Sequence, residues 1–140
     1  MSAPYEDDPG RAGDAELAAL IAPALLPGET VRIHLRGTAV PHALAAVFTC
    51  GRPRPLFLAL TRHRLILLYP GPPRSGWADP VGRVVVEGFR TKRGGTSRLR
   101  LRRLAAPERP IRIRVAEEWR AEAARIAAEL PPATPFTLPD

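Results

Sequence analysis

The spacing of apolar residues changes twice along the chain. Between residues 14 and 26 the apolar positions recur at helical spacing, which predicts a short helix that begins at the N-cap Asp14. Pro23 lies inside this pattern and is expected to kink or end the helix, because proline has no backbone N–H to donate. The apolar positions of this helical face are Leu17, Leu20, Ile21, Ala24 and Leu25.

From residue 31 the spacing falls to two, which is the period of a β-strand. Val31, Ile33 and Leu35 alternate with polar residues, and six later apolar or alternating segments are separated by Gly, Pro or short turns. Residues 40–55 fit either a short helix or a strand, followed by a stiff basic loop. The six later segments predict strands near 56–61, 64–69, 74–79, 83–88, 97–104 and 109–115.

The last apolar pattern is helical again and covers residues 116–130. Trp119, Ala123 and Ile126 share one face of this segment, and Pro131 stops it. Its apolar stripe is expected to cover an open end or edge of the strands.

Together these patterns predict one domain of the mainly-β class with helices. We expect a short N-terminal helix over 14–26, a small barrel or two packed antiparallel sheets over 31–115, and the C-terminal helix over 116–130. Residues 1–13 are expected to be a disordered tail, and residues 131–140 a loose proline-rich tail.

The composition of the 140 residues excludes several classes of protein. A single cysteine, Cys50, cannot form a disulfide within the chain, and no apolar run reaches the roughly 20 residues of a membrane-spanning helix. The acidic N-terminus lacks the basic-then-apolar order of a secretory signal. We therefore expect a protein of the reducing cytoplasm.

Residues suited to catalysis or metal binding are sparse in the middle of the chain. Asp79 and Glu87 are the only acidic residues between Val31 and Pro107, so this stretch provides no carboxylate pair suited to acid–base chemistry. The cysteine and the histidines do not have the spacing of a zinc site. We therefore expect no enzyme activity, no cofactor and no metal. The residues considered for a metal site are His34, His42, Cys50 and His63.

The formal net charge of +7 comes from a basic middle between two acidic ends. Residues 1–30 hold six acidic residues and one arginine, residues 31–115 hold 18 basic and three acidic residues, and residues 116–140 hold five acidic and two basic residues. All basic residues except Lys92 are arginine, whose guanidinium group suits bidentate contact with phosphate or carboxylate. This favours an anionic partner, and the codon usage of a GC-rich genome stays open as the alternative explanation.

Arginine alternates with apolar residues in two neighbouring segments, 97–104 and 109–115. If these segments form a hairpin with its apolar side chains inward, five guanidinium groups share the outer surface. That surface binds an external anion, pairs with the acidic ends of this chain or a second copy, or is simply solvated and screened by salt. The five residues are Arg98, Arg100, Arg102, Arg112 and Arg114, and the further candidates for anion binding are Arg32, Arg36, Arg52 and Arg54.

Three segments resemble a bacterial pleckstrin-homology-like (PH-like) domain of the PH/GRAM superfamily, nearest the YokE-like group. They are LLPGETV at 25–31, LALTRHRLILL at 58–68, and the run from Trp77 through VVV at 84–86 to GTSRLRL at 95–101. A closing helix that carries a tryptophan, here Trp119, is typical of the superfamily. The resemblance implies a seven-stranded bent barrel of two antiparallel sheets, capped by the C-terminal helix and without catalysis.

Members of this superfamily bind lipid headgroups, peptides or proteins, or have no known ligand. Those that bind phosphoinositides carry a basic motif across the first two strands and their loop. This chain has bases in its first strand and in the loop, but none in LFLALT at 56–61. The bases present are Arg32, Arg36, Arg52 and Arg54.

We therefore expect a non-enzymatic binding or adaptor module. Its arginine-bearing sheet would dock an anionic surface, either inner-membrane lipid or an acidic protein, in the bacterial cytoplasm or at the inner face of the membrane. Self-assembly, with acidic helices of one copy on the basic sheet of another, is the first alternative. Non-specific nucleic-acid binding is the second, and it is disfavoured because the arginine-bearing strands have no aromatic residues on which bases stack.

Overall fold

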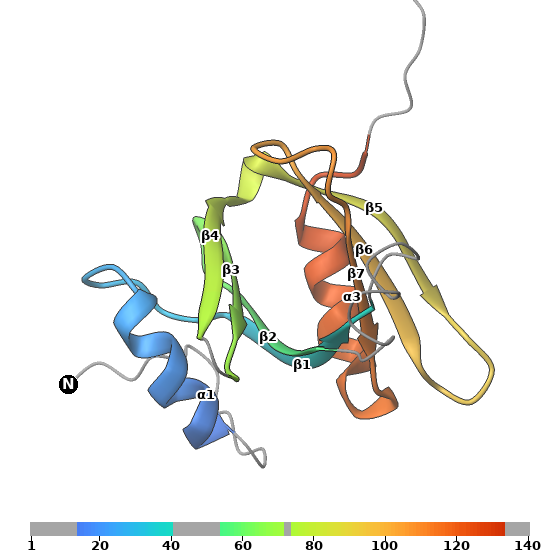
Figure 1. The fold of residues 1–140 in the computed structure, drawn as a ribbon, viewed down its shortest axis with the longest axis horizontal. Helices are drawn as coiled ribbons and strands as arrows, with labels where there is room; N and C mark the ends of the chain where they lie inside the picture. Colours follow the sequence, from blue (N-terminus) through green and yellow to red (C-terminus); the bar gives the residue numbers. More distant parts are fainter. Residues whose placement is uncertain (1–13, 41–53, 72–73, 134–140) are drawn as a thin grey trace, which may run out of the picture.

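The computed structural model describes residues 14–40, 54–71 and 74–133, so the expectations for residues 1–13 and 134–140 lie outside it. Seven antiparallel strands form one sheet that curls into a half-barrel, with helix α1 outside the curl and helix α3 inside it (Figure 1). The mainly-β class with two helices is therefore confirmed. The elements are α1 (Asp14–Ile21), β1 (Ile33–Ala39), β2 (Arg54–Leu60), β3 (Arg64–Tyr69), β4 (Ser75–Pro80), β5 (Val84–Thr91), β6 (Ser97–Arg103), β7 (Ile111–Val115) and α3 (Arg120–Glu129).

The strands lie in the order β4-β3-β2-β1-β7-β6-β5. Two meanders, β1 to β4 and β5 to β7, meet where Thr38 and Ala39 of β1 pair with Arg114 and Ile113 of β7. At this crossing a Cβ on Gly37 would lie 2.8 Å from Ile113 Cγ2, so glycine allows the close approach of the two strands. Hydrogen bonding therefore joins all seven strands into one curled sheet.

The inner face of the sheet and α3 form the main hydrophobic core. Strand alternation sends Leu99, Leu101 and Ile113 inward, where they are almost completely buried. Ala123 and Ile126 of α3 are fully buried against the same cluster. Trp119, in the single 3-10 turn before α3, is 4% exposed and contacts the His34 ring at 5.5 Å between ring centroids. The C-terminal helix thus fills the curl of the sheet.

A second hydrophobic cluster lies on the outer face of β2 and β3. Leu17 and Ile21 of α1 pack there against Phe57, Ala59 and Ile66. These two strands are therefore buried on both faces, which explains why their sequences are almost continuously apolar rather than alternating.

α1 is shorter and β5 is longer than the sequence predicts. α1 ends at Ile21, and Pro23 lies in a 3-10 helix over Ala22–Ala24, in agreement with the expected break at that proline. β5 continues to Thr91, beyond the predicted end near residue 88, and this includes Phe89 in the strand, packed against the main core.

The segment after α3 is fixed to the sheet, whereas the sequence suggested a loose tail from residue 131. Val86 N donates to Pro131 O, and Ala133 N donates to Val86 O, both at 2.9 Å. These bonds add a short parallel segment to the outer edge of β5.

A nearly buried ion pair fastens the segment after α1 to the β2–β3 turn. The Glu29 carboxylate, on a side chain that is 6% exposed, accepts hydrogen bonds from both Nε and Nη2 of Arg64. It also accepts from Thr61 Oγ1 at 2.9 Å and from Leu26 N at 3.0 Å. The hydrogen bonds from Arg64 are the main reason that the pKa of Glu29 is lowered to about 2. Burial of the carboxyl group raises this pKa, and the hydrogen bonds from Leu26 and Thr61 lower it further.

Glu29→Gln is expected to lower the free energy of unfolding by about 2 kcal/mol near neutral pH, because it leaves a nearly buried Arg64 without its countercharge. The pKa of Glu29 is lower in the folded chain than in the unfolded chain, so the carboxylate stabilises the fold above its ordinary pKa of 4.5. This stabilisation is lost as pH falls from 4.5 towards 2. Urea unfolding of both proteins across this range should show their difference shrinking as pH falls.

The matched control is Glu16→Gln, which removes the more exposed Glu16–Arg36 pair. Its expected effect is below about 0.5 kcal/mol because exposed ion pairs contribute little. An effect of Glu29→Gln as small as that of the control would contradict the stabilising role of the Glu29–Arg64 pair.

Candidate anion-binding face

Arginines from three strands share the outer surface of β5, β6 and β7. Arg98 of β6 lies opposite Arg90 of β5 on one side and Arg114 of β7 on the other, and Arg100 lies opposite Arg112. Their apolar neighbours point into the core, so strand alternation places the arginines on the other face. We call this surface the arginine face, and it consists of Arg90, Arg98, Arg100, Arg112 and Arg114.

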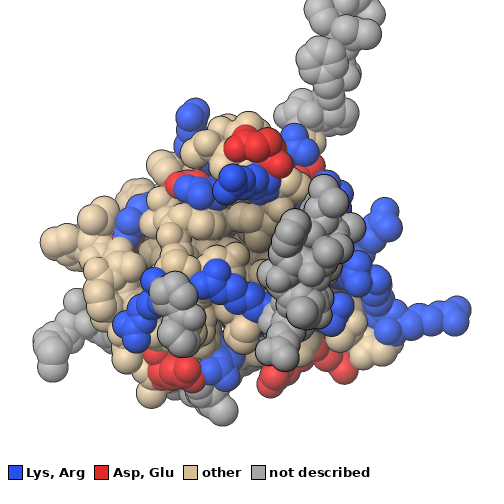
Figure 2. All heavy atoms as spheres, viewed as in Figure 1, with Lys and Arg blue, Asp and Glu red and all other residues tan. Residues whose placement is uncertain are grey.

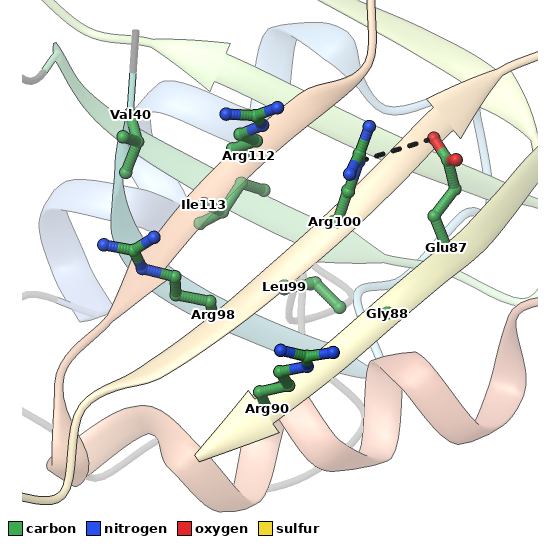
Figure 3. Close-up of a pocket in the computed structure, with 9 residues that line it drawn as sticks. All are labelled: Val40, Glu87, Gly88, Arg90, Arg98, Leu99, Arg100, Arg112 and Ile113. Carbon is green, nitrogen blue, oxygen red and sulfur yellow. Dashed lines mark ion pairs between the residues drawn. The ribbon is translucent and has the colours of Figure 1, made fainter. Parts of the chain in front are cut away.

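Glu87 supplies the carboxylate at the edge of the arginine face. A β-bulge between Val86 and Gly88 interrupts the β5–β6 register at this residue. Arg102 donates to Glu87 through Nε and Nη2, both at 2.9 Å, and Arg100 Nε lies 3.8 Å from the same carboxylate (Figure 3). Arg102 is therefore neutralised at the rim of the face.

Four of the five guanidinium groups of the arginine face lack such a countercharge among the described residues. Among residues 14–40, 54–71 and 74–133, no carboxylate lies within ion-pair distance of Arg90, Arg98, Arg112 or Arg114. Like charges opposite each other across a sheet destabilise it, and here they concentrate positive potential on one surface. Figure 2 shows Lys and Arg side chains projecting from the side of the molecule where β5 and β6 lie.

A shallow cavity of about 310 Å³ lies within the arginine face. Arg90, Arg98, Arg100 and Arg112 line it, with Arg100 across from Gly88 and with Arg98 and Arg112 farther from that glycine (Figure 3). A Cβ on Gly88 would meet nothing within 4 Å. The missing side chain of this glycine therefore keeps the cavity open beside Arg100, its cross-strand neighbour.

The remaining arginines named from the sequence do not join this face. Arg32 donates to Glu129 of α3 at 2.7 and 2.9 Å. Arg36 pairs with Glu16 of α1 and lies over the Phe57 ring. These two side chains hold the helices against the sheet, and Arg52 lies outside the described residues.

Arg54 is also engaged within the fold. Its guanidinium group lies 4.0 Å from the centroid of the Tyr69 ring and donates to Ser75 Oγ at 3.0 Å. Burial raises the pKa of Tyr69, and the nearby charge of Arg54 opposes that shift. The structure thus brings together four of the nine arginines named from the sequence, with Arg102 beside them.

Sequence reasoning missed Arg90 and the role of Glu87. The glycine at position 88 suggested the end of a strand, although Phe89 and Thr91 continue the alternation around Arg90. Sequence reasoning also missed Arg103, which donates to Asp79 through Nε at 2.6 Å and lies over the Trp77 ring. Hydrogen bonding to Asp79 raises the pKa of Arg103.

Of the four residues considered for a metal site, the structure describes His34 and His63. In the described part of the chain no group of three or more His, Cys, Asp or Glu could hold a metal ion, and His42 and Cys50 lie outside that part. Within the same residues, no helix combines the length and the apolar character needed to cross a membrane.

Comparison with protein-family models, with curated proteins and with solved structures found no match.

Arg98→Thr is expected to stabilise the fold at low salt, because it removes the like charge opposite both Arg90 and Arg114. The expected gain in the free energy of unfolding is about 0.5 kcal/mol at about 0.01 M ionic strength, where the screening length is about 30 Å. The gain should vanish near 1 M, where that length is about 3 Å. Urea unfolding at both salt concentrations measures the difference.

Arg102→Thr is the control for this measurement, because Arg102 is already paired with Glu87. It should give no gain at low salt. A loss of stability for Arg98→Thr at low salt would mean that Arg98 has an attractive partner in the folded chain.

Proposed function

We propose that this chain is a non-enzymatic, PH-like binding module whose arginine face docks an anionic surface, either inner-membrane lipid or an acidic protein. One observation carries the proposal: arginines in cross-strand rows, four of which have no carboxylate partner among the described residues. A surface of this kind gains Coulomb energy by meeting a negative surface, and it loses its own repulsion at the same time.

The PH-like part of the proposal is supported by the strand order and the position of α3. A bent barrel of the PH-like kind has a four-stranded and a three-stranded part and is capped by a helix. In this chain β1 to β4 and β5 to β7 would be the two parts, joined through β1 and β7, and α3 would be the cap. The segment 58–68, which carries the resemblance, contains most of the β2–β3 hairpin. Thr61 Oγ1 accepts hydrogen bonds from the backbone N–H groups of His63 and Arg64, which gives this threonine a turn-stabilising role.

Self-assembly through the acidic helices has less support. Three of the acidic residues that would be needed on a second copy, Glu16, Glu29 and Glu129, already pair with arginines of their own chain. None of these three arginines belongs to the arginine face. The acidic ends therefore have fewer charges left for the basic sheet of another copy.

The proposal predicts salt-sensitive binding to anionic vesicles. The wild-type protein should sediment with phosphatidylcholine vesicles that contain phosphatidylglycerol, and not with pure phosphatidylcholine. Combining Arg98→Glu, Arg100→Glu and Arg112→Glu should weaken this binding at least roughly 100-fold, because each base near an anionic surface contributes about 1 kcal/mol. Vesicle sedimentation at two salt concentrations measures the effect.

A matched control carries the same change in net charge away from the arginine face. It combines Arg74→Glu, Arg120→Glu and Arg125→Glu, which are exposed residues before β4 and on α3. Equal losses in the two variants would show that net charge alone, and not the arginine face, drives binding. Tighter binding to a single-stranded oligonucleotide than to the vesicles, or a salt-sensitive dimer without lipid binding, would favour one of the alternatives.

A further inference from the structure

We propose that the cavity in the arginine face is a binding site for one phosphate monoester group, carried by a lipid headgroup or by a small soluble ester. The inference rests on the proposed function and adds the ligand class and its position. Its physical basis is the combination of a concave surface, several guanidinium groups without carboxylate partners among the described residues, and a glycine where a side chain would enter the space.

The guanidinium groups reach the cavity from three strands. Arg90 comes from β5, Arg98 and Arg100 from β6, and Arg112 from β7 (Figure 3). A single row of arginines along one strand would contact an anion from one side. Groups from three strands can instead donate to different oxygens of one tetrahedral anion, and each guanidinium has the planar fork that suits two phosphate oxygens.

Charge favours a monoester over a diester at this position. The carboxylate of Glu87 already takes the bidentate contact of Arg102, and its ion pair with the arginine face is the 3.8 Å approach of Arg100. A phosphate monoester carries about −1.5 to −2 at neutral pH and has three terminal oxygens, whereas a diester carries one negative charge. The monoester therefore meets more of the positive charge around the cavity.

The size of the cavity agrees with a small polar group. Its volume of about 310 Å³ lies at the lower end of the range of small-molecule sites. The space depends on Gly88, whose backbone does not have the positive φ found at Gly28, Gly94 and Gly95. The backbone thus tolerates a larger residue at this position, and its side chain would occupy the part of the cavity beside Arg100 without changing the charge of the face.

This site is separate from the basic motif that the PH-like resemblance implies. Arg32, just before β1, and Arg36, in β1, are neutralised by Glu129 and Glu16. The arginine face lies on β5 to β7, in the other meander of the sheet.

The test compares vesicles that contain phosphatidic acid, a monoester, with vesicles that contain phosphatidylglycerol, a diester, at equal surface charge. The wild-type protein should bind phosphatidic acid about tenfold more tightly, as expected for one additional charge-assisted hydrogen bond. Gly88→Leu should abolish this preference, because its side chain occupies the part of the cavity beside Arg100, while the variant keeps every arginine of the face. Combining Arg98→Gln with Arg112→Gln is the second variant, which tests the site even if Gly88→Leu does not fold.

Titration calorimetry with glycerol 3-phosphate identifies the source of the ester. Binding of this probe, and its loss in the variants, supports a site that takes soluble esters as well as headgroups; binding to phosphatidic acid vesicles alone supports the headgroup. Two results overturn the monoester site and leave the proposed function intact. The first is equal binding of the wild type to both lipids, and the second is an unchanged preference for phosphatidic acid in folded Gly88→Leu. Failure to bind either anionic vesicle overturns docking to membrane lipid, and failure to bind glycerol 3-phosphate as well overturns the monoester site.

Discussion

The burial of apolar side chains on one face of β6 and β7 is the constraint on which the rest of the structure depends. A strand has a period of two, so once Leu99, Leu101 and Ile113 enter the core, the arginines between them must face outward. Burying each such side chain contributes roughly 1.5–3 kcal/mol, whereas each like-charged cross-strand pair opposes folding by roughly 0.2–1 kcal/mol. The core therefore holds together a set of cations that would separate in an unfolded chain.

The fold uses arginine in two different ways. Arg64 and Arg103 make hydrogen-bonded pairs with Glu29 and Asp79. The first pair ties the segment after α1 to the β2–β3 turn, and the second joins β4 to β6, which lie far apart in the strand order. Arg98 and Arg112 have no such partner among the described residues and are held in place only by the strands that carry them. The same residue type thus stabilises the fold at some positions and, among the described residues, leaves charge without a carboxylate partner on the outer face of β5 to β7. Composition alone does not separate these roles, because the separation depends on which carboxylates fold next to which strands.

Much of the fold was predictable from the sequence, because alternation and helical spacing are local properties. They predicted both helices, the break at Pro23 and all seven strands, and they predicted correctly that Arg98 and Arg112 lie on the outer face of a hairpin. The pairing of Arg32 and Arg36 with helix carboxylates was not predictable, since it joins residues that are far apart along the chain. Arg90 and Glu87 were missed because a bulge interrupts the alternation in β5, and the cavity at Gly88 depends on three strands meeting.

The short segment after α3 has a consequence for how this molecule meets other chains. β5 is the last strand of the sheet, and a bare strand edge is a template on which a second polypeptide can assemble into larger aggregates. On that edge, Val86 N–H donates to Pro131 O, and Val86 C=O accepts from Ala133 N–H. Pro131 and Pro132 have no backbone N–H that could donate to a further strand. The arginine face therefore extends to the edge strand β5, while the backbone of β5 at Val86 cannot pair with a strand of another chain.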